Sequence, residues 1–155
     1  MCAKTLAYAT GRTLAAVDTF LAIAANCPPS ADRVHVIADA QRGDIFVGTY
    51  SMTPAGDWSC ERSPVVTAVK SWMAACPQGQ IISGPGLATI QSHLPAGMHT
   101  LPEPTWIPRA QTVARIGLQL VERGLVADCM TLEPVYLRRS AAEERAGMPE
   151  GSPEG

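Results

Sequence analysis

The sequence predicts a mixed α/β fold, and three observations support that class. Apolar side chains alternate with others along residues 34–39, and residues 45–50 are rich in β-branched and aromatic side chains, as in the two strands of a hairpin. An apolar stretch at 80–82 leads through a Gly-Pro-Gly turn into a helical pattern. Residues 110–121 repeat apolar side chains with the period of an α-helix.

The N-terminal part predicts a helix, a strand and a second helix. A helix is expected over residues 1–10, and Gly11 stands where a left-handed residue ends many helices. Residues 13–17 predict a short buried strand. Asp18 is suited to cap a helix of small side chains over residues 19–25, which a Pro-Pro pair then ends.

The hairpin is the clearest local structure in the sequence. Between the strands at 34–39 and 45–50, Gly43 can adopt the positive φ of a tight turn, and the Asp39 carboxylate can accept a hydrogen bond from the turn backbone. A third strand is expected around residues 58–62.

Helices and one short strand make up the second half. Thr67 is expected to cap a helix whose apolar residues have the spacing i, i+3, i+4, i+7, namely Val69, Trp72, Met73 and Cys76. After the strand at 80–82 comes a helix that carries Leu87, Ile90 and Leu94.

The last helix follows a proline-rich connection at 102–108. Its predicted apolar stripe consists of Ala110, Val113, Ala114, Gly117, Leu118 and Val121, and Gly124 is expected to end it. A returning strand is expected at 132–139, and residues 146–155 predict a disordered tail.

Composition excludes several classes of protein. The chain has 155 residues, 46% of them hydrophobic, which suits one domain or one domain plus a fragment of another. Its formal net charge of −2 argues against direct binding of nucleic acid. Five cysteines without a CxxC pair favour reduced thiols and a cytoplasmic location. The apolar runs are too short to cross a membrane, and no export signal is apparent.

Gly84-Pro85-Gly86 has two interpretations. A turn of this kind before a helix is where phosphates bind, so the segment could form part of a nucleotide site. Thr89 stands where the dinucleotide fingerprint needs glycine, and Pro85 lacks the N–H that a phosphate cradle would use. We therefore favour a structural strand-to-helix turn.

No constellation of residues predicts catalysis or a metal site. The histidines at 35, 93 and 99 have no partner at metal-ligand spacing, and each is expected on a strand face or at the surface. Ser83 is not in a nucleophile elbow, because Ile81 occupies the position of the first glycine. The carboxylates are scattered. No catalytic residue, metal or cofactor is expected.

Two segments together resemble one known family. Asp39-Ala40-Gln41-Arg42-Gly43-Asp44-Ile45-Phe46 and Leu132-Glu133-Pro134-Val135-Tyr136-Leu137-Arg138-Arg139 are similar to the DAxRG hairpin and the closing LEPxYLR of the bacterial TsaB (YeaZ) proteins. Residues 3–11 and 14–24 resemble a helix and a strand–helix unit of that family, in the same order. The residues that carry the family motifs are Asp39, Arg42, Gly43, Gly84, Gly86, Glu133, Pro134, Tyr136 and Arg138.

The resemblance implies a two-lobed fold of the actin/sugar-kinase/Hsp70-like (ASKHA, ribonuclease H-like) class. Residues 1–28 would be the end of the first lobe, and residues 32–139 would be the second lobe with its hairpin. The family's opening strand and its GPGSFTGLRIG segment have no counterpart here, so the chain resembles an N-terminally truncated member. Residues 1–28 are then expected to be less stable than 32–139, or to be completed by another copy. Arg109 stands where the family often has a small capping serine.

The resemblance also implies a function. TsaB proteins are inactive relatives of TsaD, and they support TsaD in making threonylcarbamoyl-adenosine next to the tRNA anticodon. A TsaD-like protein, in a heterodimer, and a TsaE-like ATPase are the expected partners, with a homodimer as a further alternative. Lys4, Leu6 and Tyr8 are the expected partner interface. An older O-sialoglycoprotein endopeptidase (Gcp-like) label exists for the family, but this sequence offers no residues for a protease.

Two other functions and one residue role stay open. The chain could be an ATP-binding enzyme of the same superfold that uses Gly84 to Gly86, or a non-functional remnant. Arg138 could contact a phosphate or a partner's carboxylate, or it could tie the last strand to the body of the protein.

Overall fold

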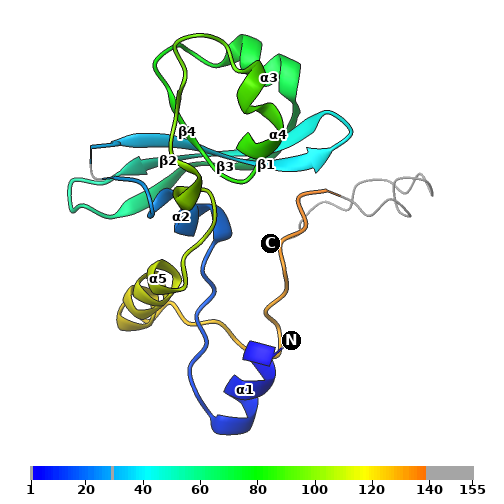
Figure 1. The fold of residues 1–155 in the computed structure, drawn as a ribbon. Coiled ribbons are helices and arrows are strands. Elements are labelled where there is room, and N and C mark those ends of the chain that lie inside the picture. Colours follow the sequence, from blue (N-terminus) through cyan, green and yellow to red (C-terminus); the bar gives the residue numbers. More distant parts are fainter. Residues whose placement is uncertain (1, 29, 139–155) are drawn as a thin grey trace.

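A computed structural model describes residues 2–28 and 30–138 and contains a five-stranded mixed sheet with helices on both faces (Figure 1). The strand order is β3-β2-β1-β4-β5. The strands are β1 Arg33–Gln41, β2 Asp44–Met52, β3 Trp58–Ala68, β4 Ile81–Ser83 and β5 His99–Thr100. The helices are α1 Cys2–Thr10, α2 Thr19–Ala24, α3 Val69–Ala75, α4 Leu87–Ile90 and α5 Ala110–Glu122, with short 3₁₀ helices η1 Gln91–His93 and η2 Glu103–Thr105.

The predicted hairpin is confirmed and forms the centre of the sheet. β1 and β2 pair antiparallel, from Arg33 opposite Ser51 to Gln41 opposite Asp44. β3 adds antiparallel to β2, whereas β4 pairs parallel with β1 and β5 parallel with β4. β3 is longer than the strand expected at 58–62, because it continues along β2 as far as Ala68.

Both faces of the hairpin are buried, which explains its apolar composition. On one face, Val34, Val36 and Tyr50 pack with Ile23 and Ala24 of α2. The opposite face packs against α3 and α4, through a cluster made of Ile37, Ile45, Val47, Trp72, Ile82, Leu87 and Ile90. The sheet is thus the middle layer of three.

The N-terminal elements agree with the prediction except for the strand. α1 ends at Thr10, directly before Gly11, whose φ is +64°. The Asp18 carboxylate caps α2, because it accepts a hydrogen bond from the Leu21 N–H at 2.6 Å. The buried strand expected at 13–17 is wrong. Leu14 makes only an isolated bridge with Ala127, since no described strand runs beside this segment. Figure 1 shows α1 set apart from the sheet at the end of this linker.

Three further expectations need correction. Thr67 does not cap α3: it pairs with Ile45 inside β3, and the capping position is Ala68, without a side-chain hydrogen bond. The helix after the Gly-Pro-Gly turn is only four residues long and continues as η1. Residues 132–138 form no strand, because no described strand lies beside them and Pro134 has no N–H to donate.

The last helix is confirmed, but the environment of its predicted stripe is not that of a core. α5 ends before Gly124, whose φ is +74°, as expected. Ile116 is the buried residue of this helix, whereas Leu118 of the predicted stripe is 60% exposed. Arg109 precedes α5 at the capping position and makes no side-chain cap bond there. Arg139 and the expected tail at 146–155 lie outside the described residues. Within the described chain, no helix has the length and apolar character needed to cross a membrane.

Candidate functional site

α1 presents two of the three expected interface residues to solvent. Leu6 is exposed and Tyr8 is 72% exposed, whereas Ala7 is the buried residue of this helix. Lys4 has a different environment: its ammonium donates to the Leu132 carbonyl at 2.8 Å and faces the Met130 carbonyl at 3.4 Å. Lys4 therefore ties α1 to the C-terminal segment, 128 residues away in sequence.

The C-terminal segment 132–138 spans the distance between α1 and the hairpin. It is held at one end by Lys4 and at the other by Arg138, whose guanidinium donates to the Ala40 carbonyl at 2.6 Å and to Asp44 Oδ2 at 3.4 Å. Of the two roles left open for Arg138, a tie between the last segment and the body of the protein is thus present, although the segment is not a strand. Between these two ends Glu133, Pro134 and Val135 are exposed, and Tyr136 is 82% exposed.

The hairpin turn gathers three motif residues that the sequence analysis singled out. Asp39 Oδ1 accepts the Gln41 N–H at 2.7 Å, as expected. Arg42 and Gly43 have φ values of +56° and +83°, the pair of left-handed residues that a two-residue hairpin turn requires. The Gly43 carbonyl accepts the Val69 N–H at 3.0 Å, so the turn is fastened to the start of α3. Gln41 is also left-handed, at +64°.

Gly84 and Gly86 are explained by the close approach of β1. A Cβ on Gly84 would lie 2.3 Å from the Ile37 carbonyl oxygen, and a Cβ on Gly86 would lie 3.1 Å from the Ala38 Cα. The Gly86 N–H donates to the same Ile37 carbonyl at 3.0 Å. The glycines allow the turn to pack against the strand, which is the structural role that the sequence favoured.

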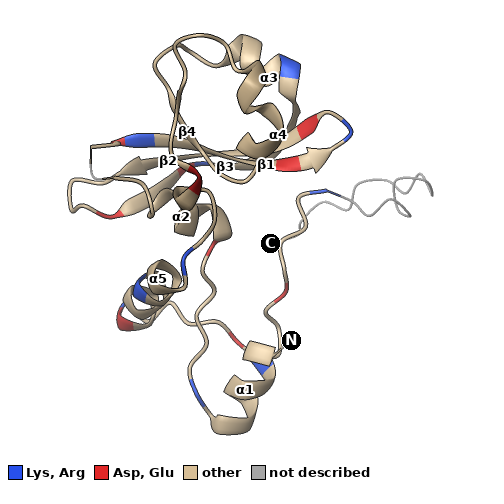
Figure 2. Cartoon of the chain, viewed as in Figure 1, with Lys and Arg blue, Asp and Glu red and all other residues tan. Residues whose placement is uncertain are grey.

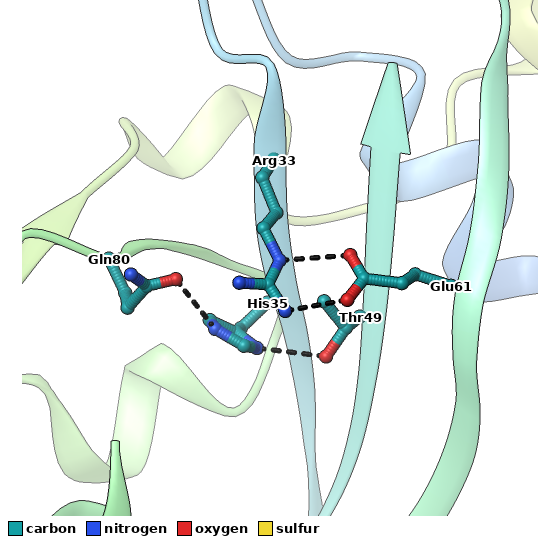
Figure 3. A network of polar contacts seen from close by, with 5 residues as sticks. All are labelled: Arg33, His35, Thr49, Glu61 and Gln80. Carbon is teal, nitrogen blue, oxygen red and sulfur yellow. Dashed lines mark hydrogen bonds and ion pairs between the residues drawn. The ribbon is translucent and has the colours of Figure 1, made fainter. Parts of the chain in front are cut away.

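A polar network that the sequence did not predict crosses the sheet (Figure 3). Arg33 of β1 reaches over to Glu61 of β3 with two hydrogen bonds, of 2.9 and 2.7 Å. His35 lies between Thr49 Oγ1 and Gln80 Oε1, each 3.1 Å from a ring nitrogen. Because the Gln80 oxygen can only accept, His35 Nε2 carries a proton. The network links β1, β2, β3 and the residue before β4.

The surroundings of His35 favour its neutral form. Burial lowers the pKa of His35 below its usual range, and the hydrogen bond to Gln80 offsets part of that effect. The ring of Trp72 meets the imidazole edge-on, with 6.4 Å between centroids. These contacts are those of a structural histidine on a strand face. His93 and His99 are exposed, also as expected.

Most of the motif residues and the three expected interface residues therefore lie in two separate regions. Asp39, Arg42, Gly43 and Arg138 meet at the hairpin turn, with Gly84 and Gly86 behind it against β1. Lys4, Leu6 and Tyr8 lie at the other end of segment 132–138. Figure 2 shows that charged residues are sparse on α1 and along this segment. Among residues 2–28 and 30–138, no three His, Cys, Asp or Glu side chains are grouped to hold a metal ion.

Comparison with known proteins supports the fold through solved structures alone. No protein-family model and no curated protein sequence matches the chain. YeaZ from Pseudomonas aeruginosa superposes with a TM-score of 0.72 at 21% identity over 87% of this chain. A second structure, described as an uncharacterized protein with similarity to peptidase YeaZ from Pseudomonas aeruginosa, gives 0.65 at 23% identity, again over 87%. This chain covers 65% and 63% of those two chains, which is less than two thirds of either.

Proposed function

We propose that this chain is a TsaB-like, non-catalytic subunit that binds a TsaD-like protein and supports threonylcarbamoylation of tRNA adenosine next to the anticodon. The observation that carries the proposal is the similarity of fold to YeaZ, with a TM-score of 0.72 over 87% of the chain. The ordered TsaB-like motifs in the sequence support the same assignment. The two-lobed ASKHA class follows from it, with the sheet described above in the second lobe.

In this proposal the exposed side of α1 is the surface that meets the partner. Leu6 and Tyr8 are large apolar side chains exposed on a nine-residue helix. A helix of this length is marginally stable in water unless an apolar face is covered. Lys4 contributes indirectly, because its bonds to the 130 and 132 carbonyls hold the start of segment 132–138 beside the helix.

The remaining parts of the assembly are proposed on the same basis. A heterodimer with the TsaD-like protein is the functional unit, a TsaE-like ATPase joins it, and the site of action is the cytoplasm. Catalysis belongs to the TsaD-like partner. With a net charge of −2, this chain is not proposed to bind tRNA by itself.

Co-purification with the TsaD-like protein of the same organism tests the proposal. The double variant Leu6→Ser/Tyr8→Ser should bind about tenfold more weakly or worse, since truncated aromatic anchors commonly lose more than ~1 kcal/mol. Val65→Ser is the matched control: Val65 is 57% exposed on the edge strand β3, and its loss should leave binding unchanged. Failure of the unaltered chain to bind, or equal weakening by both variants, would contradict the proposal.

A further inference from the structure

A cleft lies between the hairpin turn and helices α3 and α4. Its volume is about 590 Å³, which lies within the range of small-molecule sites. Three elements supply its apolar lining, with Ile45 from β2, Val69 and Met73 from α3, and Ile90 from α4. Ile45 and Ile90 are buried, so they form an apolar floor. This floor favours an occupant whose surface is mainly apolar.

The charged groups of the cleft lie at its mouth and favour neither sign of charge. Two cations, Arg42 and Lys70, line the cleft together with two carboxylates, Asp39 and Asp44. Asp39, Arg42 and Lys70 are exposed, and the half-buried Asp44 has the Arg138 guanidinium 3.4 Å away. A charged ligand group placed over the apolar floor would lose its water without gaining a partner there, which is costly. The part of a ligand that enters the cleft is therefore expected to be uncharged.

The wall formed by the hairpin turn is held in place by the fold itself. Gln41 and Arg42 have φ values of +64° and +56°, a conformation that is strained for residues with a Cβ and that is common at ligand clamps. The Gly43 carbonyl fastens the turn to α3 by accepting the Val69 N–H at 3.0 Å. In the part of the chain that the structure describes, the Gln41 side chain makes no hydrogen bond. Its amide can therefore donate to a ligand or accept from one.

We propose that this cleft binds an uncharged small molecule whose surface is mainly apolar and which carries one hydrogen-bonding group, such as a carbonyl, a hydroxyl or an N–H. The apolar part of the ligand covers Ile45, Met73 and Ile90, and its polar group meets the Gln41 amide at the mouth. The site is independent of the proposed TsaB-like function, because it involves neither α1 nor a partner protein.

Fluorescence titration with N-phenyl-1-naphthylamine tests the proposal in the full chain. This probe is uncharged and apolar, carries one N–H, and becomes fluorescent when it is buried. Thr89 lines the cleft from an exposed position, so Thr89→Trp should fill the cleft and weaken probe binding about tenfold or more. Ala88→Trp is the matched control, because Ala88 is exposed on the same helix but does not line the cleft, and it should bind the probe like the unaltered chain.

A second variant separates filling of the cleft from damage to α4. The Thr89 hydroxyl donates to the Gly86 carbonyl at 2.9 Å, and Thr89→Ala removes this bond while leaving the cleft open. Thr89→Ala should therefore bind the probe normally. Equal binding by Thr89→Trp and Ala88→Trp would overturn the proposed site, and so would a loss in Thr89→Ala as large as that in Thr89→Trp.

A charged probe tests the proposed class of ligand. Anilinonaphthalene sulfonate has the same rings and N–H with one added negative charge. The part of its binding that Thr89→Trp removes should be weaker than the corresponding part for N-phenyl-1-naphthylamine, because the sulfonate loses water over the apolar floor. Binding of the sulfonate in the cleft that is as tight as that of the uncharged probe, or tighter, would overturn the assignment of an uncharged ligand.

Discussion

Replacing Gly84 with alanine should destabilise the protein strongly, and the structure gives two separate reasons. The φ of Gly84 is +112°, in a region that residues with a Cβ rarely adopt, which costs ~1–3 kcal/mol. The new Cβ would also lie 2.3 Å from the carbonyl oxygen and 2.8 Å from the nitrogen of Ile37. β1 is the central strand, so relieving this overlap means moving a packed backbone, at ~1–3 kcal/mol more.

The expected loss is therefore about 2–6 kcal/mol, out of the ~5–15 kcal/mol that domains commonly have. Gly56→Ala is the matched control, because Gly56 has a positive φ of +82° but no atom within 4 Å of its added Cβ. That variant should lose only ~1–2 kcal/mol, the cost of the left-handed conformation alone. Urea unfolding of the three proteins measures both free energies, provided that the slope of the transition stays constant.

Equal losses in the two variants would refute the reasoning, since the close approach to β1 would then contribute nothing. The same outcome would reopen the interpretation of Gly84-Pro85-Gly86 as a phosphate-binding turn. A clearly larger loss in Gly84→Ala than in Gly56→Ala supports the packing role that the contacts with Ile37 indicate.

Two further predictions concern local stability and pH. Amide hydrogen exchange of the monomer should be much faster in residues 2–17 than in the β1–β2 hairpin, because α1 keeps Leu6 and Tyr8 exposed. Equally strong protection of both regions would contradict this prediction. Because the pKa of His35 is lowered in the folded state, its contribution to stability is present above pH 6.5 and is lost as the pH falls through the folded pKa. Urea unfolding between pH 5 and 8 measures this loss of stability. The unaltered chain and a control variant, in which the exposed histidine at 93 is replaced by glutamine, should lose the same amount as the pH falls. His35→Gln should lose less.

The hairpin could be predicted from the sequence because its determinants are local. Alternating side chains fix the two faces of β1, and the Asp39 side chain and Gly43 fix the turn within a few residues of it. The N-cap of α2 is local in the same way, since Asp18 and the Leu21 N–H are three residues apart. Where a few neighbouring residues decide a conformation, sequence patterns are sufficient.

The expectations that failed depended on distant residues. An apolar run such as 13–17 is compatible with a strand, but a strand also needs a neighbour, and Leu14 has only its bridge to Ala127. Thr67 has the side chain of a helix cap, yet pairing with Ile45 keeps it in β3. The network around His35 joins residues up to 45 positions apart, and no spacing along the chain indicates it.

α5 shows why an apolar stripe can be predicted correctly and still lie outside the core. The helix is oriented mainly by polar contacts on its inner side: Thr112 bonds to the Asn26 side chain at 2.5 Å, and Gln119 and Arg123 bond to Asp57 at 3.1 and 3.0 Å. Such half-exposed contacts fix a direction but add little stability, whereas burial of apolar area adds most of it. Since the apolar area of Leu118 is still exposed, a protein that covers this stripe would stabilise α5 more than its present contacts do. The same physical argument applies to Tyr8 on α1, and it is why docking is the activity that we propose for this end of the molecule.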